Sequence, residues 1–522
     1  MLVDAVAEVK RLSRFMKERI DLRDDANNDP YMNLLPVLDT VRAGTFVSGQ
    51  WSRTGEELAI LDPATAAPWS TLDLSGAKQV EEAVAAAHAA GPAWTATSAS
   101  ERAAILARWA GLVFENLEPL AELEARNVGK PLSGGRMNAI IAGSIIQYTA
   151  GAADRPHGVT LPVRSPEFVG FTQREPFGVC AIILPWNVPA VLAAANLAPA
   201  LAAGNTVVLK PSEVAPLITL ALVELAAEAG LPAGVLNVVT GYGPVVGSPL
   251  VRHRCVDHVT FVGSTATGSS IMTAAAEHVI PVKLELGGKS PHLVFADADL
   301  DAAIPSIVRG ITENAGQNCN AGSRLLVQHG IADEVRDRIV AGMRAVRLGA
   351  WSDDLDMGPL VNQSQHCRVT GILEQARAAG ARVLTGGGHP ADGDPRGYFL
   401  APTVLDGLAP GAAVTGQEIF GPVLTIETFT DDRAAVQLAN STDFGLLAAI
   451  WTNDVSRAHR IANGVVAGQV TVNQHSDQGV IGLPFNMAKA SGFSAGSGYK
   501  GLEAFSREKA IAIKLLHCGG ES

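Results

Sequence analysis

The sequence predicts an α/β protein with two lobes, each built around a mostly parallel sheet. Short apolar runs typical of strands alternate with Ala-rich runs typical of helices between residues 178 and 286. A second alternation of the same kind extends from about residue 325 to residue 470. This rhythm is typical of βαβ units, whose parallel strands bind ligands beyond their carboxyl ends. With 522 residues, the chain is also too long for one compact core.

The elements follow in order along the chain. Apolar residues recur at helical spacing before residue 22 and predict an amphipathic N-terminal helix: Val3, Val6, Val9, Leu12, Phe15, Met16 and Ile20. Further helices are expected at 78–92, 99–126 and 133–151. Two β-rich runs, 159–163 and 168–172, predict a projecting hairpin. The first lobe then follows, with strands at 179–184, 206–209, 236–239 and 258–262 and helices near 190–202, 216–229 and 243–252.

Composition excludes several classes of protein. The formal net charge is −12 and no Lys/Arg-rich stretch offers a path for phosphates, so nucleic acid is not an expected partner. No apolar run has the length of a membrane span, so no membrane partner is expected either. The first residues are too acidic for a transit peptide and lack the apolar core of a signal peptide, which predicts a cytoplasmic protein.

The cysteines are widely spaced and form no metal-binding pattern. The sequence has five: Cys180, Cys255, Cys319, Cys367 and Cys518. Cys319 differs from the others because glycine, alanine, serine and carboxamide side chains surround it in the run from Gly316 to Arg324. Little bulk covers this thiol, and nearby amides can donate to a thiolate or an oxyanion. A buried, inert cysteine is the alternative interpretation of this residue taken alone.

Polar motifs follow the predicted strands of the first lobe. Asn187 lies in Leu-Pro-Trp-Asn-Val-Pro after the first strand, and Lys210-Pro-Ser-Glu213 follows the second. A glycine-bounded loop, 263–268, precedes a helix expected to begin near Ser269, and Glu285-Leu-Gly-Gly follows a further strand. Each motif alone is compatible with an ordinary turn. The loop 241–247 also resembles a dinucleotide loop, but it lacks the expected acidic residue downstream.

Together and in this order, the motifs resemble the aldehyde dehydrogenase superfamily, from about Phe46 to Lys509. The resemblance implies the aldehyde dehydrogenase fold, with a Rossmann-like cofactor-binding domain, an α/β catalytic domain and a small β oligomerisation arm. The implied divisions are an N-terminal helical extension (1–45), the cofactor-binding domain (46–154 and 177–286), the catalytic domain (287–488), and the arm with the C-terminal segment (155–176 and 489–522). A homodimer or homotetramer is expected.

The resemblance also implies an oxidoreductase that converts an aldehyde to a carboxylic acid. Cys319 would be the nucleophile, Asn187 and the backbone N–H of Cys319 would hold the oxyanion, and Glu285 would be the general base for thioester hydrolysis. Glu285 favours the hydrolytic branch over CoA-acylating relatives. A CoA-acylating enzyme and a catalytically silent member of the same fold are the alternatives.

The expected cofactor is NAD, with NADP possible. A carboxylate at Glu213 can accept from both ribose hydroxyls and would repel a 2′-phosphate. The resemblance implies that ten residues contact the cofactor: Trp186, Lys210, Ser212, Glu213, Gly263, Ser264, Gly268, Leu286, Glu418 and Phe420. No metal is expected.

The substrate region departs from the family pattern. Small side chains after Asn187 predict a wide substrate tunnel, and therefore a bulky or cyclic aldehyde as substrate. Polar side chains before and within the 474–483 loop suggest that this substrate carries polar groups. The predicted substrate contacts are Val188, Leu192, Glu313, Asn318, His475 and Phe485. Asn196 and Gly496 replace a lysine and a glutamate that form a proton relay in many relatives. We therefore expect the proton from Glu285 to leave through water.

Overall fold

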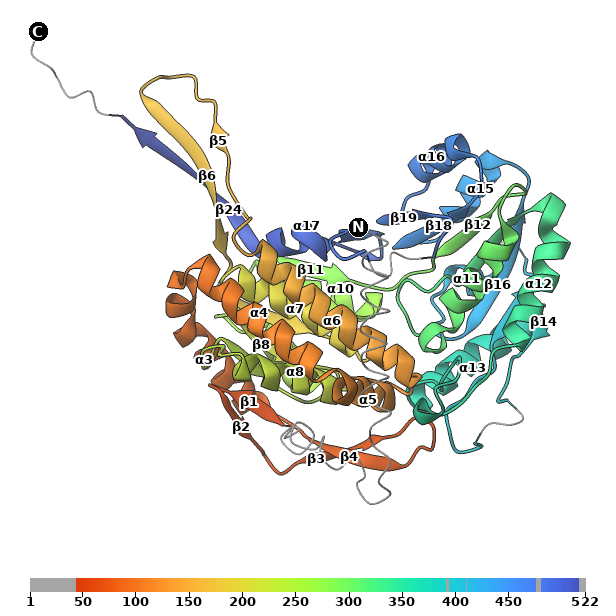
Figure 1. Ribbon diagram of the computed structural model, residues 1–522, viewed down its shortest axis with the longest axis horizontal. Helices are drawn as coiled ribbons and strands as arrows, with labels where there is room; N and C mark the ends of the chain where they lie inside the picture. The colour runs from red at the N-terminus through yellow and green to blue at the C-terminus, as the bar shows by residue number, and fades with distance from the viewer. Residues whose placement is uncertain (1–43, 391–393, 410, 476–479, 516–522) are drawn as a thin grey trace, which may run out of the picture. The chain divides into compact units, whose positions relative to one another are not determined.

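The computed structural model describes residues 44–515, except 391–393, 410 and 476–479 (Figure 1). All described residues belong to one compact unit. The predicted N-terminal helix, Cys518 and part of the polar 474–483 loop lie outside the described residues. Two large sheets organise this unit and confirm the predicted α/β class.

The first sheet has the strand order β2-β1-β9-β8-β7-β10-β11-β22. Its bounds are β1 (Thr45–Val47), β2 (Gln50–Ser52), β7 (Val179–Ile183), β8 (Thr206–Lys210), β9 (Leu236–Val238), β10 (His258–Val262), β11 (Val282–Glu285) and β22 (Gly492–Phe493). Strands β9, β8, β7, β10 and β11 are parallel. Every residue of β7, β8 and β10 is buried, because helices cover both faces of a parallel sheet.

Helices pack around this sheet, and α6, α7 and α4 lie together on one of its faces (Figure 1). The bounds are α3 (Ala77–Ala96), α4 (Ala99–Glu115), α5 (Leu117–Val128), α6 (Leu132–Ala152), α7 (Pro189–Ala202), α8 (Leu217–Glu228), α9 (Ser248–Val251) and α10 (Thr265–Ala276). The single helix predicted at 99–126 is wrong, because Asn116 leaves helical geometry at φ −105° and ψ 29° between α4 and α5. The helix predicted at 243–252 begins as a π-helical turn, Gly243–Gly247, before α9.

Helix α10 begins earlier than the sequence predicts. The hydroxyl of Ser264 accepts from the backbone N–H of Thr267 and caps the helix, so Thr265 and not Ser269 is its first residue. Gly268 therefore lies inside the helix and not in a loop. A Cβ at Gly268 would lie 2.7 Å from the Leu286 side chain, so this glycine lets α10 pack closely against the chain after β11.

The second sheet has the order β14-β15-β16-β13-β12-β18-β19 and is parallel except for the β14–β15 pair. Its strands are β12 (Pro291–Val294), β13 (Arg324–Gln328), β14 (Arg382–Thr385), β15 (Thr403–Asp406), β16 (Val423–Phe429), β18 (Leu447–Trp451) and β19 (Gln469–Val472). The accompanying helices are α11 (Leu300–Thr312), α12 (Ala332–Arg344), α13 (Gln363–Ala378), α14 (Ala413–Gly416), α15 (Asp432–Ala439) and α16 (Val455–Gly464). Apolar clusters fill both faces of this sheet.

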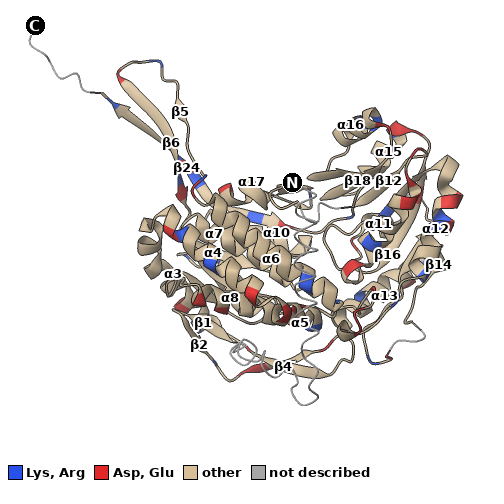
Figure 2. Cartoon of the chain, in the orientation of Figure 1, with Lys and Arg blue, Asp and Glu red and all other residues tan. Residues whose placement is uncertain are grey.

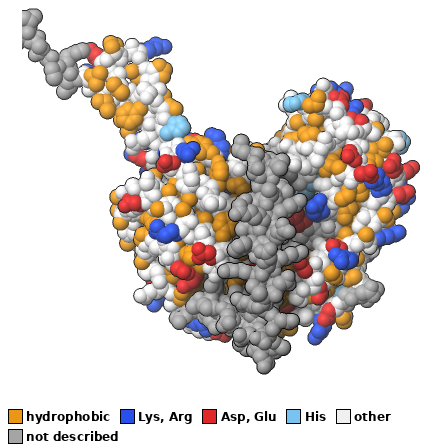
Figure 3. All heavy atoms as spheres, in the orientation of Figure 1, with side chains coloured by type: hydrophobic (Ala, Val, Ile, Leu, Met, Phe, Trp, Pro, Cys, Tyr) orange, Lys and Arg blue, Asp and Glu red, His pale blue; other side chains and the backbone are white. Residues whose placement is uncertain are grey.

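A three-stranded arm projects from the first lobe (Figure 1). The predicted hairpin is confirmed as β5 (Thr160–Leu161) paired with β6 (Phe168–Pro176), and the third strand is β24 (Ser506–Lys514). Apolar side chains gather on the arm's surface (Figure 3), including Val159, Leu161, Val163, Phe168, Val169, Ile513 and Leu515. Charged side chains elsewhere are of mixed sign (Figure 2).

The chain between the second sheet and the arm returns to the first lobe. Strand β22 pairs antiparallel with β11, which places Gly492 opposite Glu285. Short pairs flank this return: β17 (Phe444–Gly445) with β21 (Ala488–Lys489), and β20 (Phe485–Asn486) with β23 (Ala495–Gly496). Helix α17 (Gly498–Glu503) then leads into β24. A separate ribbon, β3 (Glu57–Leu61) with β4 (Pro68–Asp73), follows β2.

Candidate active site

One cavity of about 320 Å³ brings the three predicted catalytic residues together. Cys319, Glu285 and Asn187 all line it. Asn187 follows β7 and Glu285 ends β11, so both lie where the parallel strands of the first sheet present their carboxyl ends. Predicted cofactor and substrate residues share the same walls, namely Trp186, Leu192, Gly263, Ser264, Leu286, Glu418 and Phe420.

The backbone before Cys319 is tightly constrained. Asn314, Ala315 and Gly316 have φ values of 52°, 54° and 68°, all in the left-handed region. For a residue such as Ala315 this conformation costs about 1–2 kcal/mol, which the surrounding contacts must offset. A Cβ at Gly316 would lie 2.2 Å from the carbonyl oxygen of Gly421, so only glycine fits there. The segment delivers the thiol to the cavity through a strained turn.

The Cys319 thiol is in its neutral form in the free protein. Burial is the largest cause that raises the pKa of Cys319, and the carboxylates of Glu418 and Glu285 add to it. Two backbone hydrogen bonds, from Asn320 and Cys319 itself, oppose this shift, and the net pKa is about 12. The surrounding field therefore opposes a standing thiolate. A thiolate at this position would require a base or an added positive charge beside the thiol.

Asn187 is held by both lobes. The side-chain Nδ2 of Asn187 donates to the backbone carbonyl of Gln317 at 2.9 Å. The backbone carbonyl of Asn187 accepts from Asn314 Nδ2 at 2.9 Å and from Lys130 Nζ at 3.2 Å. Lys130 is paired at 2.8 Å with Glu124, whose side chain is fully buried. Sequence reasoning missed this network because α5, α6 and the chain before α7 meet only in the fold.

Glu285 has a cationic neighbour that the sequence analysis did not expect. Lys283 Nζ lies 2.8 Å from Glu285 Oε1 and 2.8 Å from Asn196 Oδ1. The strand β11 itself supplies this ammonium group. The exit of the Glu285 proton through water stays a prediction. A Cβ at Gly496 would lie 2.7 Å from Glu285 Oε1, so the backbone of Gly496 packs directly against that side of the carboxylate.

Glu418 and Phe420 form the opposite wall. Glu418 Oε1 accepts from the backbone N–H of Gly288 at 3.1 Å, and burial raises the pKa of Glu418. The Phe420 ring meets Trp186 edge-on, with centroids 5.5 Å apart. Two residues of α13 that sequence reasoning missed hold this wall in place: Gln365 donates to the carbonyl of Phe420, and Arg368 donates to the carbonyls of Glu418 and Ile419.

The remaining predicted cofactor residues lie along the same sheet edge, outside the lining of this cavity. Lys210 ends β8, and its Nζ donates to Glu213 Oε2 at 2.8 Å. The Ser212 hydroxyl accepts from the backbone N–H of Val214 at 3.2 Å. Gly268 lies in the first turns of α10, whose N-terminus follows β10.

The predicted substrate residues are spread more widely. Val188 caps α7, and the Asn318 carboxamide donates to the carbonyl of Glu313 at 3.4 Å. The His475 ring packs against His292, with centroids 4.8 Å apart, and against Gly310. Phe485 pairs with Gly496 through β20 and β23. Of the predicted substrate residues, the cavity around Cys319 is lined by Leu192 alone.

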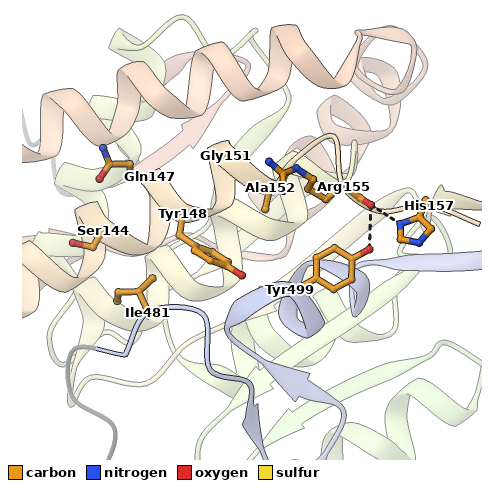
Figure 4. A pocket seen from close by; sticks show the side chains of 9 residues that line it. All are labelled: Ser144, Gln147, Tyr148, Gly151, Ala152, Arg155, His157, Ile481 and Tyr499. Atoms are coloured by element: carbon orange, nitrogen blue, oxygen red, sulfur yellow. Dashed lines mark hydrogen bonds between the residues drawn. The ribbon is translucent and has the colours of Figure 1, made fainter. Parts of the chain in front are cut away.

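A second, more open cavity of about 690 Å³ lies between α6 and the C-terminal segment (Figure 4). Tyr148, Ile481 and Tyr499 contribute much of its lining. The backbone carbonyl of Arg155 accepts from Tyr499 Oη at 3.1 Å and from His157 Nδ1 at 2.8 Å (Figure 4). The cavity contains none of the predicted catalytic residues.

Two kinds of feature are absent from the described part of the chain. No helix in it is both long and apolar enough to span a bilayer. Its His, Cys, Asp and Glu side chains include no group of three or more placed to hold a metal ion.

Known proteins resemble this chain over most of its length. The model of the aldehyde dehydrogenase family matches residues 51–511. Betaine aldehyde dehydrogenase of Bacillus subtilis is 36% identical over 472 residues, covering 89% of this chain and 96% of that protein, and an aldehyde dehydrogenase of Emericella nidulans is 38% identical over 480 residues, covering 90% and 95%. The crystal structure of betaine aldehyde dehydrogenase from Staphylococcus aureus in complex with NAD+ is 33% identical, with a TM-score of 0.90, and covers 92% of this chain and 96% of that one. The chain therefore belongs to the aldehyde dehydrogenase family.

Proposed function

We propose that this enzyme oxidises a bulky or cyclic aldehyde to its carboxylic acid with NAD, and that Cys319 carries the acyl group. The observation that carries the proposal is the shared cavity of Cys319, Asn187 and Glu285. A nucleophile, an amide donor and a carboxylate base in one cavity meet the needs of acyl transfer to water.

The residues around the cavity fit a dinucleotide. The α10 N-terminus offers backbone N–H groups beside Gly263 and Ser264, which suits a pyrophosphate. Lys210 and Glu213 would hold a ribose, and Glu213 favours NAD over NADP. Gly287 keeps space beside Glu418, since a Cβ there would lie 2.4 Å from Glu418 Oε2. Bound NAD supplies a hydride acceptor, and the NAD+ complex of the Staphylococcus aureus relative supports this assignment.

The protein groups divide the chemistry between two stages. In the first, the Cys319 thiol gives up its proton to solvent, Sγ adds to the aldehyde carbon, and the oxygen becomes an alkoxide. The Asn187 carboxamide carries two N–H groups, of which one donates to Gln317, so the other can stabilise this alkoxide together with the N–H of Cys319. Loss of hydride leaves a thioester on Sγ. In the second stage, Glu285 removes a proton from water, which attacks the thioester and releases the acid.

The substrate class rests on the side chains nearest the thiol. Leu192 is an aliphatic wall residue, and Val188 next to Asn187 is small, which supports a wide entrance and a bulky or cyclic aldehyde. The curated relatives suggest betaine aldehyde as a second candidate, with a branched trimethylammonium head. Both choices predict that a short linear aldehyde is the poorer substrate.

The arm supports a homo-oligomer. Strand β24 adds to β6, and exposed apolar side chains cluster on the resulting ribbon. Contiguous exposed apolar surface on a projecting sheet is typical of an interface between subunits. We infer that copies of this chain pair through the arm.

The proposed domain division follows the two sheets. The first sheet's strand β11 ends at Glu285 and the second sheet begins at Pro291, which supports a boundary at 286/287. The pairing of β24 with β6 supports grouping 155–176 with 489–522. Strand β22 is an exception, because it lies in the C-terminal segment and joins the first sheet.

The described cysteines support a cytoplasmic location. Cys180, Cys255, Cys319 and Cys367 are all unpaired. Free thiols are the usual state of cysteines in a reducing compartment.

An aldehyde panel tests the proposed function directly. NADH formation would be followed by absorbance with benzaldehyde, cyclohexanecarboxaldehyde, betaine aldehyde and acetaldehyde, each with NAD or NADP. We expect the bulky aldehydes with NAD to give the highest kcat/KM, and no activity from Cys319→Ala. Acceleration by CoA with an acyl-CoA product would instead identify the CoA-acylating alternative. No product from any aldehyde would support the catalytically silent one.

A further inference from the structure

We propose that Lys283 is the positioning residue of the Glu285 carboxylate, and that it supplies from β11 the cation on which thioester hydrolysis depends. The inference rests on the proposed function, since it concerns the second stage of that reaction. Lys283 and Glu285 are two positions apart on one strand, so their side chains leave β11 on the same face. An ammonium group and the carboxylate base therefore meet by strand geometry.

The ammonium group of Lys283 has three partners. Nζ donates to Glu285 Oε1 and Asn196 Oδ1, each at 2.8 Å, and lies 5.2 Å from the centroid of the Phe505 ring. The Lys283 side chain is only 1% exposed. Three partners match the three N–H donors, with the aromatic ring acting as a cation–π acceptor. These contacts hold Nζ in place, and Nζ in turn holds one carboxylate oxygen of Glu285 in place.

Asn196 is oriented for this contact. Its Nδ2 donates to the backbone carbonyl of Leu192 one turn earlier on α7, at 2.9 Å, which turns Oδ1 toward Lys283. Leu192 itself lines the cavity with Cys319. The same turn of α7 therefore carries both a wall of the cavity and the support of the lysine.

Gly496 limits where the carboxylate can go. A Cβ at this position would lie 2.7 Å from Glu285 Oε1, so the bare backbone leaves just enough room for the oxygen that Lys283 holds. The β22–β11 pairing keeps this part of the C-terminal segment against Glu285. Lys283 thus binds the carboxylate on one side while Gly496 confines it on another.

Stability alone is a weak explanation for Lys283. Buried ion pairs can often be replaced by apolar side chains of similar volume without loss of stability. Nearby His258 is neutral, because burial and the charge of Lys283 lower its pKa to about 3. His258 therefore adds no positive charge, and Lys283 is the ion-pair partner of Glu285.

The test separates acylation from hydrolysis without any cofactor. With 4-nitrophenyl acetate, the Cys319 thiol releases its proton to solvent, Sγ bonds to the acetyl carbon, and 4-nitrophenolate leaves with the ester C–O bond pair. Water then adds to the thioester and passes a proton to Glu285. The C–S bond breaks with its electron pair on sulfur, acetic acid is released, and the proton from Glu285 restores the thiol. The burst of 4-nitrophenolate reports acylation, and the steady rate reports hydrolysis.

We expect Lys283→Ala to keep a burst of about one per site while the steady rate falls about ten- to a hundredfold, the size of effect that a displaced base produces. The double variant Lys283→Ala/Asn196→Lys should recover most of the steady rate. A lysine at position 196 on α7 is placed to bring its ammonium group to the position that Lys283 Nζ occupies in the parent. Lys489→Ala, which removes a lysine bound only to backbone carbonyls, is the control and should match the parent.

Three results would overturn the positioning role. These are a parent-like steady rate in Lys283→Ala, an equal loss of burst and steady rate, and a double variant no faster than Lys283→Ala. Circular dichroism checks folding, and Lys283→Met replaces the alanine variant if that one is unfolded. A parent enzyme that gives no burst and no NADH contradicts the proposed function itself, which is a distinct outcome.

Discussion

Asn187 and Gln317 join the two lobes across the cavity, because the carboxamide of the first donates at 2.9 Å to the backbone carbonyl of the second. Gln317 is fully buried, and its own carboxamide accepts from the backbone N–H of Val361 at 2.9 Å and donates to the carbonyl of Asn314. The position of the proposed oxyanion donor and the position of the cysteine loop are therefore set by the same contacts.

Replacing Asn187 by alanine should remove the proposed oxyanion donor. We expect Asn187→Ala to lower kcat for aldehyde oxidation about a hundred- to a thousandfold, the usual effect of deleting one such donor. Asn116→Ala, which changes an asparagine at the α4–α5 junction, serves as the control and should keep the parent kcat. A kcat within threefold of the parent for Asn187→Ala would show that the alkoxide is held elsewhere.

Breaking the buried Lys130–Glu124 pair should destabilise the fold. Lys130→Met leaves the fully buried Glu124 carboxylate without its ion-pair partner, and we expect the free energy of unfolding to fall by about 3–5 kcal/mol. Urea unfolding followed by tryptophan fluorescence measures the change. The double variant Lys130→Met/Glu124→Gln should recover part of the loss, and a double variant that loses the sum of both single effects would argue against coupling.

Much of the site could be predicted from motifs, for a physical reason. Asn187, Lys210 and Glu285 each follow or end a parallel strand, and such strand ends converge at one edge of a sheet. Lys283 was missed because a lysine inside a short buried strand carries no motif. The available signal was its spacing of two residues from Glu285, which places both side chains on the same face of β11.

Contacts between distant segments and one local helix cap account for what the sequence analysis missed or misplaced elsewhere. The pairing of β24 with β6 joins segments that no local pattern connects, so only the hairpin was predictable. The start of α10 was misjudged because glycines at 263 and 268 suggested a loop, whereas capping by Ser264 starts the helix between them.

Gly288 should tolerate no side chain. A Cβ there would lie 2.3 Å from the carbonyl oxygen of Cys319, so Gly288→Ala must displace the backbone that carries the thiol. We expect at least a hundredfold loss of kcat, since small displacements of reacting groups have effects of this size. Gly388→Ala is the matched control, because its Cβ would meet no atom within 4 Å. Equal activity of the two variants would contradict the steric argument.

Charges on the arm should disrupt the proposed oligomer. Val169 and Ile513 face each other across β6 and β24 and are 40% and 48% exposed. Val169→Lys/Ile513→Lys places two like charges on the apolar ribbon, and we expect a smaller species by size-exclusion chromatography with light scattering. Val455→Lys, at a 70% exposed position on α16, is the control and should leave the parent mass unchanged. An unchanged mass for the arm variant would exclude the arm as the interface.

Alkylation of Cys319 should depend steeply on pH. Since the pKa of Cys319 is raised to about 12, the thiolate fraction in the free enzyme is small and rises about tenfold per pH unit below that value. We expect the second-order rate of iodoacetamide modification to rise nearly tenfold for each unit between pH 7 and pH 10. Peptide mapping by mass spectrometry separates Cys319 from the exposed Cys367. A rate that levels off below pH 9 would mean that the thiol ionises far more readily than its raised pKa and its carboxylate neighbours imply.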